Sequence, residues 1–142
     1  MKLLAVSALC VILLAPVAVA QTLSCPDPQD PTPTKARRDY VAPLAAGVSA
    51  LHGSRFAEAV SLSDAAAPHA MDARQLQAAL SLRSAALAPV EDDAQLVSTL
   101  ETQLAVGCHS RVGEREAIAV QLEAARYRLQ SQSQSQPQPQ PQ

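Results

Sequence analysis

Apolar residues recur at every third or fourth position between residues 40 and 130, which is the spacing of one face of a helix. Long alternating runs of Val, Ile, Thr and aromatic residues, from which strands are built, are missing there. The pattern predicts an all-α domain over residues 40–130. The residues that form the stripes are Phe56, Val60, Leu76, Leu80, Leu87, Val97, Leu100, Leu104, Ile118, Leu122 and Leu129.

Prolines and glycines divide this region into about five short helices. Ser54 is placed to cap the second helix, and Asp72 with Gln75 has the spacing of a capping box at the third. Because the connections have about two to seven residues, neighbouring helices are expected to pack antiparallel. The expected helices are residues 42–51, 55–67, 72–88, 91–107 and 114–129.

Alanine makes up 28 of the 142 residues, and only 2% of the chain is aromatic. Small side chains let helix axes approach closely, but each alanine buries little apolar area. The composition therefore predicts a thin hydrophobic core and modest stability.

Residues 1–20 have the layout of a secretory signal peptide. Lys2 provides a positive start, an apolar run follows, and Ala18-Val19-Ala20 places small residues where a signal peptidase cuts. The apolar run is shorter than the ~20 residues of a spanning helix, which argues against an uncleaved anchor. We therefore expect an exported protein, periplasmic or secreted, with no membrane span after cleavage.

Two segments of different composition flank the helical domain. Residues 21–39 have prolines at positions 26, 28, 31 and 33, which favours an extended linker. Residues 131–142 repeat Ser, Gln and Pro and have no apolar area to offset the cost of ordering, so a disordered tail is predicted.

Cys25 and Cys108 are the two cysteines that remain after cleavage. In an oxidising compartment they are candidates for a disulfide that ties the linker to the turn before the last helix. An intermolecular bridge from Cys25, or two free thiols, are the alternatives that the sequence leaves open.

Charge and motifs argue against several function classes. Without Lys2 the chain has 10 basic and 13 acidic residues, too balanced for binding to nucleic acid or anionic membranes. His52, His69 and the adjacent Cys108-His109 lack the spacing of a metal site, so no metal and no cofactor are expected. Glu91, Asp92 and Asp93 fit a helix start, and no nucleophile or phosphate-loop motif is present, so we do not expect an enzyme.

Residues 44–68 resemble a tetratricopeptide repeat. Gly47 matches the small residue at which the two helices of the family's repeat cross, and Ala59 and Ala66 match the small positions of its second helix at spacings of 12 and 7. Phe56-Ala57-Glu58-Ala59 resembles the family's aromatic-x-x-Ala turn.

The third and fourth helices look like a second, degenerate unit, with Leu82 at the place of Gly47 and Ala94 at that of Ala59. The resemblance covers residues 44–107 and extends to small exported helical-repeat proteins of alphaproteobacteria. It implies two helix pairs, a capping helix at residues 114–129, and an inner face that binds a peptide or protein.

The expected function is a non-catalytic interaction module, an adaptor or assembly helper with a protein or peptide partner in the cell envelope. The alternative is a structural or stress-type envelope protein that self-associates without a specific ligand. Partner-binding candidates are the residues that would line the inner face, Leu44, Val48, Leu51, Gln75 and Arg83.

Overall fold

The computed structural model describes residues 23–26, 35–109 and 111–135, and every regular element in them is helical. The prediction of an all-α domain is therefore confirmed. The expected signal peptide, most of the linker and residues 136–142 lie outside the described residues. The elements are α2 (Arg38–His52), α3 (Phe56–Ala66), η1 (Ala67–His69), α4 (Ala73–Leu87), η2 (Ala88–Val90), α5 (Asp93–Val106) and α6 (Glu114–Gln134).

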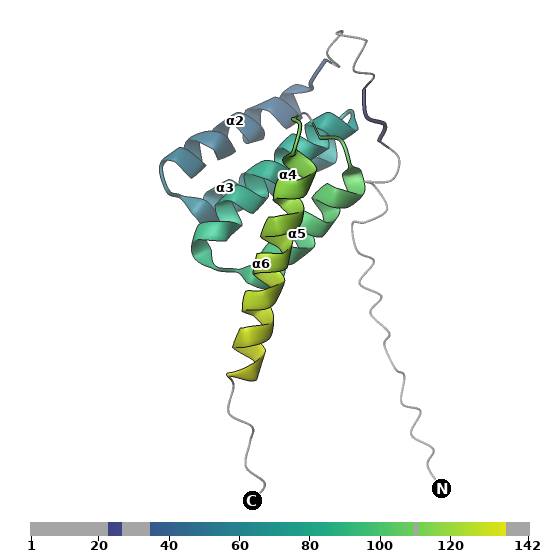
Figure 1. The fold of residues 1–142 in the computed structure, drawn as a ribbon. Coiled ribbons are helices and arrows are strands. Elements are labelled where there is room, and N and C mark those ends of the chain that lie inside the picture. The colour runs from purple at the N-terminus through teal and green to yellow at the C-terminus, as the bar shows by residue number, and fades with distance from the viewer. Residues whose placement is uncertain (1–22, 27–34, 110, 136–142) are drawn as a thin grey trace, which may run out of the picture.

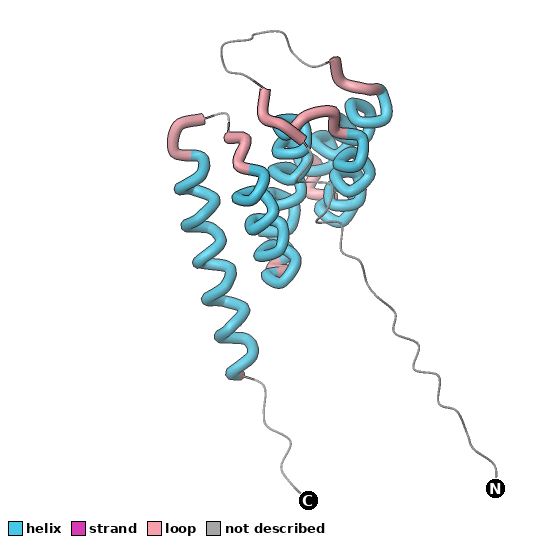
Figure 2. Tube along the Cα trace, turned by 90° about the vertical axis from the view of Figure 1, so that its right-hand side faces the viewer, coloured by secondary structure: helices cyan, strands magenta, loops and turns pink. Residues whose placement is uncertain are grey.

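The helices form a stack in which each packs on the next in sequence, α2 on α3, α3 on α4, α4 on α5 and α5 on α6. The helix α2 also contacts α4, one step further along the stack (Figure 1). Figure 2 shows the same stack from the side, with the C-terminal half of α6 extending past the ends of the other helices. The two ends of the stack are therefore α2 and α6.

Local breakers set most of the helix boundaries. Asp72 caps α4 by accepting a hydrogen bond from the Gln75 backbone N–H at 2.8 Å, as the capping-box spacing predicts. Gly107 ends α5 in the left-handed conformation, with φ 67°, which a residue without Cβ adopts at little cost. Short 3₁₀ turns that contain Pro68 and Pro89 follow α3 and α4.

Two boundary predictions and one capping prediction were wrong. The helix α2 begins at Arg38 rather than at residue 42, because buried Tyr40 docks in its first turn and its hydroxyl donates to the Gln75 carbonyl at 2.8 Å. Ser54 does not cap α3: it lies in the turn at φ 57°, and Arg55 precedes the first helical residue. The helix α6 continues to Gln134 instead of residue 129, so the predicted tail begins inside this helix.

The core has a leucine-rich part and an alanine-rich part. Between α4, α5 and α6 it consists of Leu87, Leu96, Leu100, Ile118, Leu122 and Ala125. The two clusters among α2, α3 and α4 contain five alanines and one tyrosine: Tyr40, Ala66 and Ala79, and Ala50, Ala59 and Ala86. Since alanine buries little area, the first three helices depend on close approach more than on hydrophobic area.

Gly47 is the point where α2 comes closest to its neighbours. A Cβ atom at this position would lie 2.7 Å from Leu82 Cδ2 of α4, 3.2 Å from Leu62 Cβ and 3.7 Å from the Ala59 carbonyl oxygen of α3. Ala59 and Ala66, the other small positions of the predicted repeat, are both fully buried. A side chain at residue 47 would therefore require Leu82 Cδ2 and Leu62 to move away from α2.

Candidate functional site

The five predicted partner-binding residues do not form one exposed face. Leu44 and Leu51 pack against the two alanine-rich clusters, and only Val48 is well exposed, at 42%. The side-chain carbonyl of Gln75 accepts a hydrogen bond from the Met71 backbone N–H at 2.9 Å. The backbone carbonyl of Gln75 accepts one from the Tyr40 hydroxyl. Apart from Val48, these residues hold the fold together.

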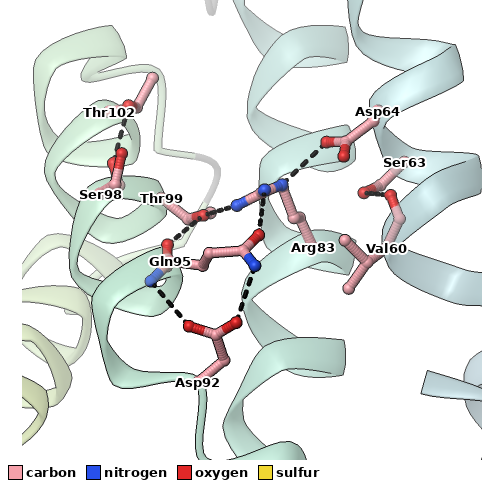
Figure 3. A network of polar contacts seen from close by, with 9 residues as sticks. All are labelled: Val60, Ser63, Asp64, Arg83, Asp92, Gln95, Ser98, Thr99 and Thr102. Atoms are coloured by element: carbon pink, nitrogen blue, oxygen red, sulfur yellow. Dashed lines mark hydrogen bonds and ion pairs between the residues drawn. The ribbon is translucent and has the colours of Figure 1, made fainter. Parts of the chain in front are cut away.

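Arg83 is the centre of a polar network that joins three helices (Figure 3). From α4 its guanidinium reaches Asp64 of α3 at 2.8 Å and, on the other side, Gln95 Oε1 of α5 at 2.8 Å and the Thr99 hydroxyl. Asp92 in turn accepts from the backbone and side-chain nitrogens of Gln95. With 20% of its side chain exposed, Arg83 acts as a structural tie between α3, α4 and α5.

Arg128 forms a second tie, at the far end of the stack. Its guanidinium binds the buried Asp93 carboxylate at 2.7 Å, and the Gln132 side chain donates to the same carboxylate at 3.2 Å. The hydrogen bond to Asp93 raises the pKa of the Arg128 guanidinium above its usual value. These contacts fix the last turns of α6 against the start of α5, which explains why the helix continues beyond residue 129.

Cys25 and Cys108 are joined by a disulfide with a Cα–Cα distance of 5.5 Å. The intramolecular bridge is thus the one that the structure contains, rather than either alternative. The segment 23–26 also contacts the start of α4, because the Ser24 carbonyl accepts from the Ala73 backbone N–H at 3.1 Å. The N-terminal segment is therefore held where α4 begins and α5 ends.

At this same end of the α4–α5 pair lie four polar side chains, Gln77, Ser81, Gln103 and His109, here called the polar cluster. Gln103 Nε2 of α5 donates to the Ser81 hydroxyl of α4 at 3.0 Å, and Gln77 lies one helical turn before Ser81 on the same face. His109 follows Cys108 directly and is held at this end by the disulfide.

The polar cluster contains buried atoms that have no hydrogen-bond partner among the described residues. They are both side-chain atoms of Gln77, the side-chain oxygen of Gln103 and both ring nitrogens of His109. Each such atom costs about 1–3 kcal/mol when buried without a partner, so the five atoms lower the stability of this small fold. Gln77 and Gln103 are only 4% and 2% exposed.

An open cavity of about 540 Å³ meets the polar cluster at Ser81, the one member of the cluster among the described residues that line it. Its walls are Ser81 of α4, the turn at Arg111, Val112 and Gly113, and Glu114 and Ala117 at the start of α6. The Ser81 hydroxyl accepts from Gln103 and therefore retains its own proton as a donor. Ser81 links the cavity to the carboxamide of Gln103 behind it.

Of these four residues the sequence analysis considered only His109, as part of the adjacent Cys108-His109 pair, and nothing in the sequence indicated that its ring nitrogens would be buried. Gln77 and Ser81 share the face of α4 that begins with buried Ala73, a spacing that places two polar residues in a core-facing row. That spacing is the signal by which sequence alone points to them.

No family model, curated protein or solved structure matches this sequence. Within residues 23–26, 35–109 and 111–135, no three His, Cys, Asp or Glu side chains gather as a metal site would require. In the same described part of the chain, none of the helices is long and apolar enough to cross a bilayer.

Proposed function

We propose that this chain is an exported, non-catalytic helical-repeat module that binds a protein or peptide partner in the cell envelope. In this proposal α2 with α3 and α4 with α5 are two antiparallel, tetratricopeptide-like pairs, and α6 covers the end of the second pair. Helical repeats that stack in this way act by presenting an extended surface rather than a catalytic pocket.

The close crossing at Gly47 is the observation that carries the proposal. Glycine at residue 47 lets α2 approach α3 and α4 at the same point, as expected where one repeat packs on the next. The helix α2 also contacts α4 directly. Gly47, Ala59 and Ala66 are the three positions that match the repeat pattern, and all three are buried. Shape and sequence pattern therefore agree at the same residues.

The partner is expected on the exposed side of α2. Val41 and Val48 lie two turns apart on this helix and are 46% and 42% exposed, whereas Leu44 and Leu51 point into the core. A row of exposed valines on a terminal helix of a thin stack is suited to an apolar contact with a partner.

Site-specific photo-cross-linking in intact cells tests this function. A photoreactive residue at Val48 should capture one stoichiometric envelope protein, and the same residue at exposed Ser61 on α3 is the matched control. The proposal fails if Val48 and Ser61 give the same products, or if Val48 gives none. Substitution of Arg83 or Gln75 is not a suitable test, because both residues have structural partners.

One observation favours the second function, self-association without a specific ligand. The opposite end of the stack also exposes apolar side chains, with Val120 70% and Tyr127 72% exposed two turns apart on α6. Links from Val48 and Val120 to other copies of this chain alone would favour this structural function over the adaptor.

A further inference from the structure

The disulfide has one exposed and one buried half. Cys25 is exposed and lies in the segment 23–26, which is part of no helix and is drawn as the short dark purple trace in Figure 1. Cys108, just after the end of α5, is only 2% exposed. Thiol–disulfide exchange begins when a thiolate attacks one of the two sulfurs, and access decides which one is attacked. An incoming thiolate therefore meets the sulfur of Cys25.

Few noncovalent contacts hold the segment 23–26 on the helices. Among the described residues, its one backbone hydrogen bond to a helix joins the Ala73 N–H to the Ser24 carbonyl at 3.1 Å. Leu23 and Pro26 are only half-buried, and the three buried clusters contain no residue of this segment. A single hydrogen bond between neutral groups adds little net stability. The covalent bond is therefore the main attachment of the segment.

The place where the segment is attached contains polar groups that water would satisfy. Ala73 and Cys108, the two residues to which the segment is bonded, are 1% and 2% exposed. His109 follows Cys108, and both of its ring nitrogens are buried with no hydrogen-bond partner among the described residues. A buried polar atom without a partner costs more than one hydrogen bond contributes. The polar groups at this place therefore favour an open state, and the disulfide opposes it.

We propose that the Cys25–Cys108 disulfide is a thiol-exchange site, at which a dithiol reductant releases the segment 23–26 while the helices stay folded. One thiolate of the dithiol attacks the Cys25 sulfur and forms a mixed disulfide. The bond between the two cysteines breaks, and its electron pair leaves on the Cys108 sulfur, which takes up a proton. The second thiol of the reductant then attacks the mixed disulfide, which frees Cys25 as a thiol and leaves the reductant as a disulfide.

Release changes the surroundings of the first residue of α4 and of the residue after the disulfide. The Ala73 N–H loses its acceptor at Ser24, and the His109 ring gains access to water. The state of this end of the stack then follows the thiol–disulfide balance of the surroundings. The inference does not depend on the envelope partner proposed above, because that contact is expected at Val48 on α2, and either one can fail alone.

Amide hydrogen exchange of the ¹⁵N-labelled mature chain, with and without dithiothreitol, tests the release. The Ala73 N–H should exchange about tenfold faster after reduction, because its acceptor has left. The Leu76 N–H is the matched control: it donates to the Asp72 carbonyl at the start of the same helix and should keep its exchange rate. Cys25→Ser should give the faster Ala73 rate without any reductant. Equal Ala73 rates in the oxidised and reduced chain, or faster exchange at Leu76 as well, would overturn the proposal.

A second experiment tests which sulfur is attacked and whether the folded chain is the form that reacts. Glutathione is added and the products are trapped by acid, and mass spectrometry of peptides should find the adduct on Cys25 at least about tenfold more often than on Cys108. The rate of reduction by dithiothreitol should change less than about twofold on addition of about 1 M urea, whereas reduction through global unfolding would become about fivefold faster. Adducts that are equally frequent on both cysteines, or the steep dependence on urea, would refute the assignment.

Discussion

Replacing Gly47 by alanine tests the helix crossing directly. At an open helical position, glycine to alanine stabilises a protein by about 1 kcal/mol through helix propensity. At residue 47 the added Cβ would stand 2.7 Å from Leu82 Cδ2 and 3.2 Å from Leu62 Cβ, so both neighbours must move. Overpacking of this kind costs about 1–3 kcal/mol, which predicts a net destabilisation of about 1 kcal/mol for Gly47→Ala.

Urea unfolding followed by circular dichroism measures this free energy, since the chain has no tryptophan for fluorescence. Ala46→Gly is the control: residue 46 is exposed on the same helix, and the change should cost about 1 kcal/mol by propensity alone. Combining Gly47→Ala with Leu82→Ala should show a coupling energy of about 0.5–3 kcal/mol, because the shortened side chain removes the collision. Stabilisation by Gly47→Ala would refute the reasoning, since it would mean that α2 has room at this point.

Three further predictions concern other ties in the fold. Serine in place of both disulfide cysteines should lower the free energy of unfolding by about 4.5 kcal/mol, because the bridge closes a loop over a separation of 83 residues. Urea unfolding measures this loss, and an equal urea midpoint for the oxidised and the reduced protein would contradict it. Burial, with a smaller contribution from Asp72, raises the pKa of Tyr40 to about 12 from 10.0, so the folded state holds its proton longer than the unfolded state. Stability should therefore fall by about 1.4 kcal/mol between pH 8 and pH 11, and Tyr40→Phe should remove this loss whereas Tyr127→Phe should not. Arg83→Met should cost about 2 kcal/mol, because three helices lose their common donor. Asp64→Ala should cost less than about 1 kcal/mol, because that side chain is 54% exposed; equal losses in thermal melts would argue against Arg83 as the centre of the network.

The helix count and most boundaries could be predicted because their signals are local. Gly107 and the prolines of the two 3₁₀ turns act on the backbone of their own residues, and the Asp72 cap needs only a partner three positions away. The boundaries that were missed depend on distant contacts. The start of α2 depends on Gln75, 35 positions after Tyr40, and the end of α6 depends on Asp93.

The candidate site was harder to predict because apolar stripes give no indication of which polar residues become buried. Gln77 and Gln103 belong to a type that is mostly exposed, and only the packing of α4 on α5 buries them together. Arg83 and Gln75, which stay predictions as partner-binding residues, also have structural contacts: Arg83 binds side chains of α3 and α5, and the Gln75 side chain accepts from the Met71 backbone N–H just before its own helix. Helical periodicity predicts on which face of its helix a residue lies. The packing of the helices on one another determines which neighbouring helix covers that face.

The disulfide determines how the chain would respond to tension between residues 23 and 135. Force entering at residue 23 passes from Cys25 directly to Cys108 and bypasses the helices α2 to α5. The oxidised chain could then extend to only about 110 Å, because α6 and the turn before it are the parts that unravel. With the bridge reduced, the same pull would reach about 390 Å. The bond therefore makes the first four helices a mechanically closed loop and leaves α6 as the extensible part.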